Sequence, residues 1–98
     1  METLSSKEID SALAKLPGWK VEQGRLQCDL VFENFIEAFG FMTAVAIESE
    51  AMNHHPDWSN SYNKVCIKLI THSKGRLTEK DLELAERIEK LSKKYSPK

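Results

Sequence analysis

The 98-residue chain carries 14 basic and 15 acidic side chains, for a formal net charge of -1 at pH 7. These charges are interspersed, whereas binding to a phosphate backbone draws on clustered lysines and arginines, so nucleic-acid binding is excluded as the main function. The length predicts a single domain over residues 1–98. No stretch approaches the ~20 apolar residues of a membrane span and no apolar leader opens the chain, so we expect a cytoplasmic protein.

A short helix of about three turns is the first predicted element. Ser5 and Glu8 have the spacing of a capping box, in which the serine accepts from first-turn amides and the glutamate reaches back to the cap. Apolar residues then recur at helical spacing up to Leu16. Pro17-Gly18 ends the helix.

Two strands and a long helix follow. The strands are predicted at residues 19–22 and 26–32, with Gln23-Gly24 as the turn between them. Residues 34–53 contain no proline and predict a helix about 30 Å long. Its apolar side chains cover more than one stripe, so we expect this helix to be central to the core or covered in part by a partner.

A second hairpin and a last helix complete the predicted fold. The hairpin comprises strands at 58–62 and 64–71, and the last helix starts at the near capping box of Thr78 and Asp81. Short turns join the paired strands. The chain therefore predicts an α+β fold, an antiparallel four-stranded sheet with three helices on one face in the order α-β-β-α-β-β-α.

The stretch MNHHPDW, residues 52–58, holds two of the three histidines. Neighbouring side chains diverge in a helix or strand, so His54 and His55 can meet one ligand only where the backbone is irregular. The corner before Pro56 offers such a backbone. A polar helix end, with both imidazoles near the negative end of the helix dipole, explains the pair equally well.

The third histidine, His72, follows the last strand. Strict alternation places it on the solvent side with Lys68, although strand ends commonly break alternation. The three histidines with Asp57 or Cys66 would supply zinc ligands, but neither H-E-x-x-H nor C-x-x-C spacing is present. Acid-base chemistry fits better, because imidazole exchanges protons near neutral pH and no serine or cysteine stands in a sequence motif typical of a nucleophile.

At these residues the chain resembles the pterin-4a-carbinolamine dehydratases, also described as dimerisation cofactors of a liver homeodomain transcription factor. The resemblance covers most of the chain from Trp19 onward. The matching residues are Glu50-x-x-x-His54-His55-Pro56, Trp58, Tyr62-Asn63-Lys64-Val65, Thr71-His72 and Asp81.

This resemblance implies dehydration of 4a-hydroxytetrahydropterin to the quinonoid dihydropterin, without a metal or other cofactor. His54 and His72 would be the acid and base, and His55 would bind or assist. Glu50 resembles a pterin-site carboxylate. The remaining implied site residues are Asn53, Trp58 and Thr71 as substrate-binding residues and Asp81 as a supporting one.

Two of these positions have competing interpretations. Asn53 stands where some members carry aspartate, which would orient an imidazole and stabilise its charge, whereas asparagine only orients. For Asp81, capping of the last helix is favoured over direct catalysis.

The resemblance also implies partners. One hypothesis is an enzyme that serves the pathway of the aromatic amino acid hydroxylases. The other is a protein-binding module that acts as a dimerisation or transcriptional cofactor. In both, the apolar central helix predicts a homodimer or homotetramer, because a chain this short buries little of its surface alone.

Overall fold

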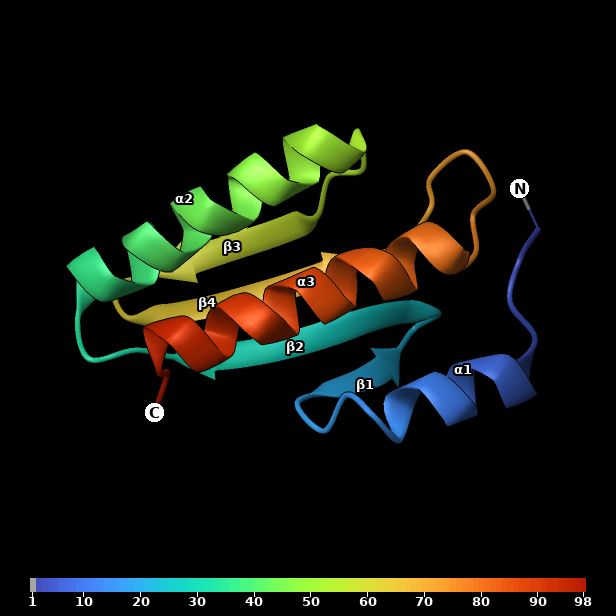
Figure 1. The fold of residues 1–98 in the computed structure, drawn as a ribbon, viewed down its shortest axis with the longest axis horizontal. Helices are drawn as coiled ribbons and strands as arrows, with labels where there is room; N and C mark the ends of the chain where they lie inside the picture. The colour runs from blue at the N-terminus through green and yellow to red at the C-terminus, as the bar shows by residue number, and fades with distance from the viewer. Residues whose placement is uncertain (1) are drawn as a thin grey trace.

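Three helices and four strands make up the part of the chain that the computed structural model describes, residues 2–98 (Figure 1). Their order confirms the predicted α-β-β-α-β-β-α arrangement and the α+β class. None of the helices in this range is long and apolar enough to cross a membrane. The bounds are α1 Ser6–Leu13, β1 Trp19–Glu22, β2 Arg25–Val31, α2 Phe35–Met52, β3 Asp57–Ser61, β4 Lys64–Leu69 and α3 Glu79–Tyr95.

The four strands form one antiparallel sheet in the order β1-β2-β4-β3. Gln23 and Gly24, which join β1 to β2, have φ of 52° and 77°, as a tight hairpin turn of this twist requires. The second hairpin places β4 beside β2 and leaves β3 at the edge. β4 ends two residues earlier than predicted, because the chain turns after Leu69 and Thr71 pairs with Arg76 instead.

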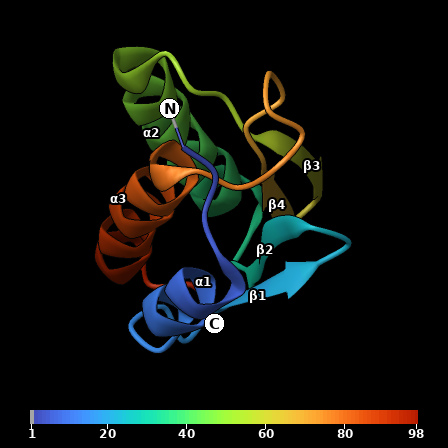
Figure 2. The same ribbon diagram turned by 90° about the vertical axis from the view of Figure 1, so that its right-hand side faces the viewer.

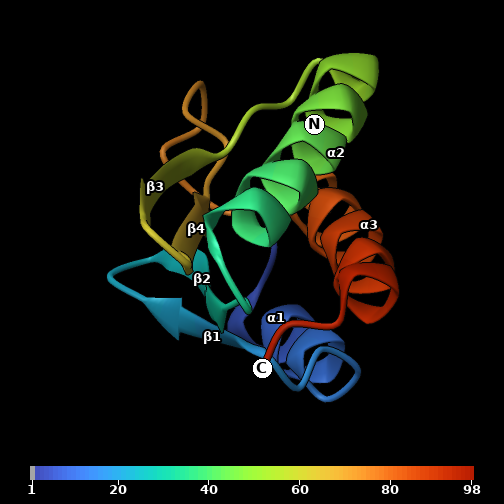
Figure 3. The ribbon, with the colours of Figure 1, turned by 90° about the vertical axis from the view of Figure 1, so that its left-hand side faces the viewer.

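All three helices lie on the same side of the sheet (Figures 2 and 3). The face of β4 that meets them carries Val65, Ile67 and Leu69, each at most 1% exposed, which confirms the predicted alternation. Helix α2 contributes a fully buried stripe that includes Phe41 and Val45. The core therefore lies between the sheet and the α2–α3 pair, and the opposite face of the sheet is mostly polar, with Val31 as an exposed apolar residue.

The helix ends follow the local sequence. Ser5 and Glu8 form the predicted capping box of α1. At α3, Thr78 and Asp81 form a second one, in which aspartate replaces the usual glutamate. Asn53 ends α2 in the left-handed conformation (φ 53°), which asparagine tolerates better than most residues.

This topology brings several chain ends to one edge of the molecule, on the right in Figure 1. Helix α2 ends there, β3 begins, β4 ends and α3 begins. Segments that are up to about thirty residues apart in sequence therefore meet beside the MNHHPDW corner. This edge is where the three histidines lie.

Candidate active site

A pocket of about 270 Å³ opens at this edge, slightly smaller than the roughly 300–1,000 Å³ of typical small-molecule sites. It takes side chains from the end of α2, from the turn after β4 and from the first turn of α3. All three histidines line it. The lining residues are Asn53, His54, His55, Ile70, Thr71, His72, Ser73 and Lys80.

The backbone corner after α2 turns the two adjacent histidines in different directions. The left-handed Asn53 ends the helix, and the amide of His54 donates to the carbonyl of Ser49, one turn back. As a result the His54 side chain is directed into the protein and is 10% exposed, whereas that of His55 stays 56% exposed. The irregular corner predicted from Pro56 thus allows both imidazoles to line one pocket.

A buried carboxylate holds His54. Its Nε2 lies 2.7 Å from Oδ1 of Asp81, which is fully buried. Oδ2 of Asp81 accepts from the Thr71 hydroxyl at 2.8 Å and from the Thr78 amide at 2.9 Å. Because a carboxylate only accepts, Nε2 of His54 is the donor in this pair.

The two threonines complete this network. The Thr71 hydroxyl gives its proton to Asp81, so Thr78 must donate to Thr71 across their 2.7 Å contact. Among buried side-chain nitrogen and oxygen atoms of residues 2–98, only Nε1 of Trp19 lacks a hydrogen-bond partner. Nδ1 of His54 forms no hydrogen bond in that range and is not among these buried atoms, so it is accessible to solvent. Because His54 lines the pocket, we infer that this nitrogen faces it.

His55 and His72 each face a carboxylate as well, but near the surface. Nε2 of His55 lies 2.9 Å from Oε1 of Glu50. Nε2 of His72 lies 3.0 Å from Oδ2 of Asp57. Solvent weakens such exposed pairs, so each contributes little to the stability of the fold.

The remaining predicted site residues separate into two groups. Asn53 and Thr71 line the pocket, the first as a helix cap and the second within the buried network. Trp58 packs against the core and is not part of the pocket lining. Asp81 caps α3 as favoured from the sequence, yet it also contacts His54, which the capping interpretation missed.

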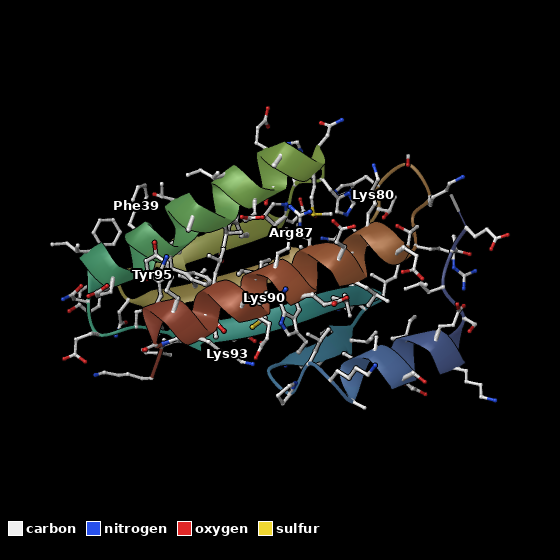
Figure 4. All side chains as sticks on the ribbon, in the orientation of Figure 1. Phe39, Lys80, Arg87, Lys90, Lys93 and Tyr95 are labelled. Atoms are coloured by element: carbon white, nitrogen blue, oxygen red, sulfur yellow. The ribbon has the colours of Figure 1, made fainter. Side chains whose placement is uncertain are left out.

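Lys80 was also missed from the sequence. It lies in the first turn of α3, beside the end of α2 (Figure 4), and is the lysine that lines the pocket. Its neighbour Asp81 was singled out because of its spacing from Thr78. The signal for Lys80 was only its place next to that aspartate.

Cysteine chemistry is not available at this site. Burial, with a smaller contribution from the Glu89 carboxylate, raises the pKa of the Cys28 thiol to about 12. Partial burial and the Asp29 carboxylate raise the pKa of the Cys66 thiol too. Both are protonated near neutral pH and are poor nucleophiles. Within residues 2–98, no three histidine, cysteine, aspartate or glutamate side chains are grouped so as to hold a metal ion.

The site thus defines a class of protein, an α+β domain whose pocket carries carboxylate-paired imidazoles suited to proton transfer. Residues 2–91 match the family described as pterin 4 alpha carbinolamine dehydratase. The chain belongs to this family, whose members are named for a hydro-lyase activity.

Relatives in two bacteria agree with this assignment. A Prochlorococcus marinus protein (strain NATL2A) is 50% identical over 88 residues, 90% of this chain and 93% of its own. One from Solibacter usitatus (strain Ellin6076) is 48% identical over 89 residues, 91% and 94% of the two chains. Both are provisionally named pterin-4-alpha-carbinolamine dehydratases.

Solved structures extend the likeness to the fold. The crystal structure of a transcriptional coactivator/pterin dehydratase from Brucella melitensis has a TM-score of 0.89 at 35% identity, and the match covers 92% of this chain and 98% of that one. A pterin dehydratase-like protein described as a RuBisCO assembly factor in the alpha-carboxysome has a TM-score of 0.63 over 76% of this chain and 86% of its own. At 21% identity, that second likeness is one of fold alone.

Proposed function

We propose that the histidine pocket dehydrates a 4a-hydroxytetrahydropterin to the quinonoid dihydropterin by acid-base catalysis. One observation carries this proposal: two histidines from the corner after α2 and one from the turn after β4 line one pocket, each with Nε2 within 3.0 Å of a carboxylate oxygen. Family membership supplies the substrate class. Two free cysteines suit a reducing compartment, so we place the reaction in the cytoplasm, in recycling of the pterin cofactor of aromatic amino acid hydroxylases.

The reaction needs one proton delivered and one removed. A protonated imidazole gives its proton to the 4a-hydroxyl group, and the C–O bond breaks as its electron pair leaves with water. A neutral imidazole takes the proton of a ring nitrogen, and the electrons of that N–H bond form the C=N double bond. Proton exchange with solvent then restores both histidines, so no covalent adduct is required.

We assign the acid and base roles to His54 and His72, and binding or assistance to His55. His54 is the rigid partner, because Asp81 holds Nε2 and leaves Nδ1 open to the pocket. Three further residues would contact the pterin or support the groups that do. They are Glu50, which pairs with His55, Asn53 and Thr71. A direct contact of the pterin with Trp58 stays a prediction, since this side chain packs against the core and does not line the histidine pocket.

Stopped-flow measurement with the purified protein tests the proposal. Conversion of 4a-hydroxytetrahydropterin is expected to run at least about 10²-fold faster than the uncatalysed reaction, the gain typical of a placed general acid or base. Protein inactivated by heat serves as the control. A rate equal to the uncatalysed one would rule out the dehydratase function for this chain.

We further propose that a second copy of the chain covers an apolar stripe on α2. Besides its buried stripe, α2 exposes Ile36 (79%), Phe39 (54%) and Ile47 (65%), spaced three and eight residues apart on the outward side of the helix. Figure 4 shows Phe39 on the side of α2 away from α3. Such a row of exposed apolar side chains is typical of an interface, and it agrees with the predicted homodimer or homotetramer.

Ile36→Glu combined with Ile47→Glu is expected to convert the oligomer to monomers, because two charges would be buried in the interface. Light scattering coupled to gel filtration measures the mass of both forms. Tyr62→Ser is the matched control, since Tyr62 is 63% exposed but lies in the β3–β4 turn. A wild-type protein of monomer mass would contradict the proposal.

The same stripe favours the second candidate function, a protein-binding module. The Brucella melitensis structure is described as both a transcriptional coactivator and a pterin dehydratase. A pull-down experiment distinguishes the two functions. The binding role is the correct one if the wild type has no dehydratase activity but captures another protein. In that case the Ile36→Glu, Ile47→Glu variant should lose this capture and His72→Ala should retain it.

A further inference from the structure

His72 is the least constrained of the three histidines. Its side chain is 63% exposed, and it lies in the turn that follows β4. The turn itself is held by backbone hydrogen bonds from Lys74 and Gly75 to Thr71 and His72, which do not involve the imidazole. Within residues 2–98, the His72 ring makes a polar contact with Asp57, whose Oδ2 lies 3.0 Å from Nε2.

Asp57 is in turn placed by the sheet. It is the first residue of β3 and pairs with Lys68 of β4. Oδ2 of Asp57 accepts a hydrogen bond from Nη1 of Arg25, the first residue of β2, at 3.2 Å, whereas its contact with His72 is a close approach of opposite charge without hydrogen-bond geometry. Three strands thus fix this carboxylate on the face of the sheet that is free of helices, beside the pocket.

The negative charge of Asp57 also favours one nitrogen of His72 over the other. Oδ2 of Asp57 lies beside Nε2, and Asp57 lines a neighbouring hollow of the sheet and not the histidine pocket. A carboxylate facing one ring nitrogen favours the proton on that nitrogen and leaves the other free. For His72 the free nitrogen is Nδ1, as it is for His54.

We propose that Asp57, held by Arg25, is a positioning residue that orients His72 so that Nδ1 serves the reaction. This rests on the proposed dehydratase function. Asp57 itself touches neither the substrate nor the reacting atoms. It acts by restricting rotation of an otherwise exposed imidazole, since small errors in the placement of a catalytic group lower the rate markedly.

Asp57→Asn tests the proposal, because it removes the charge and keeps the shape of a partly exposed side chain. We expect kcat to fall by up to about 10²-fold with KM nearly unchanged, as for a catalytic group that is no longer held in place. Asp57→Glu should recover part of kcat. Long-range ¹⁵N–¹H spectra should show His72 as the Nε2–H tautomer in the wild type and as a tautomer mixture in Asp57→Asn.

Asp29→Asn is the matched control. Asp29 lies on the same face of the sheet, and its carboxylate accepts from Gln27 at 3.0 Å instead of facing a histidine. It should leave kcat and the His72 spectrum unchanged. Wild-type kcat in Asp57→Asn, or an equal loss in Asp29→Asn, would overturn the proposal. The spectra report the contact even if the wild type has no dehydratase activity, so the two failures are distinguishable.

Discussion

His72→Ala is expected to lower kcat/KM for dehydration of 4a-hydroxytetrahydropterin by about 10²–10⁴-fold, the range for loss of a general acid or base. The side chain lines the pocket but is 63% exposed, so its removal leaves no cavity in the core. The free energy of unfolding should therefore change by less than about 0.5 kcal/mol. Stopped-flow kinetics and urea unfolding measure the two quantities on the same sample.

This combination of a large kinetic and a small structural effect is the diagnostic result. Lys74→Ala is a suitable control, because Lys74 is exposed in the same turn and lies outside the pocket. It should alter neither quantity. A His72→Ala protein that keeps most of the wild-type rate would show that proton transfer does not depend on this imidazole.

The secondary structure could be predicted almost completely, because its signals are local. The capping boxes at Ser5 and Thr78 involve residues three apart, and both form as expected. Turns and side-chain alternation are local in the same way. The end of β4 was missed because the pairing of Thr71 with Arg76 depends on how the following turn folds back.

The site could be predicted only in part, because its pairs join distant segments. His54 and His55 stood out through their proline corner, but the carboxylate that holds His54 comes from Asp81, 27 residues later. Sequence reasoning looked for such a group at Asn53, the adjacent position. Asn53 instead takes the left-handed conformation that ends α2. The absence of aspartate there therefore does not deprive His54 of a carboxylate.

The two histidines assigned to catalysis also differ in how they are held. His54 is buried against Asp81 within a closed hydrogen-bond network, whereas His72 is exposed and meets a surface carboxylate. Changes near His54 should therefore affect stability and rate together. Changes near His72 should affect the rate alone.

The network around Asp81 provides the sharpest test of that difference. Asp81→Ala would leave the Thr78 amide, the Thr71 hydroxyl and the His54 imidazole without their shared acceptor in a fully buried position. Removing one partner of a buried charged pair typically costs about 3–5 kcal/mol. For a domain whose total stability is about 5–15 kcal/mol, urea unfolding should show the loss of a large share of the free energy of unfolding.

Asp81→Asn separates the structural role from the chemical one. An amide of the same shape can still accept from Thr78 through its oxygen, so less stability should be lost than in Asp81→Ala. Its NH₂ group, however, donates to Nε2 of His54, which forces the proton onto Nδ1, the nitrogen that faces the pocket. We expect kcat to fall by about 10²–10⁴-fold in a folded protein, as for a histidine held in the wrong tautomer.

Glu79→Gln is the matched control for this pair of variants. Glu79 is also acidic and lies in the first turn of α3, but its side chain is exposed and makes no contact with a histidine within residues 2–98. Loss of its favourable interaction with the helix dipole should cost about 0.3–1 kcal/mol and leave kcat unchanged. If Asp81→Asn retained the wild-type kcat, Asp81 would be a helix cap alone, and the rigid orientation of His54 would not depend on its charge.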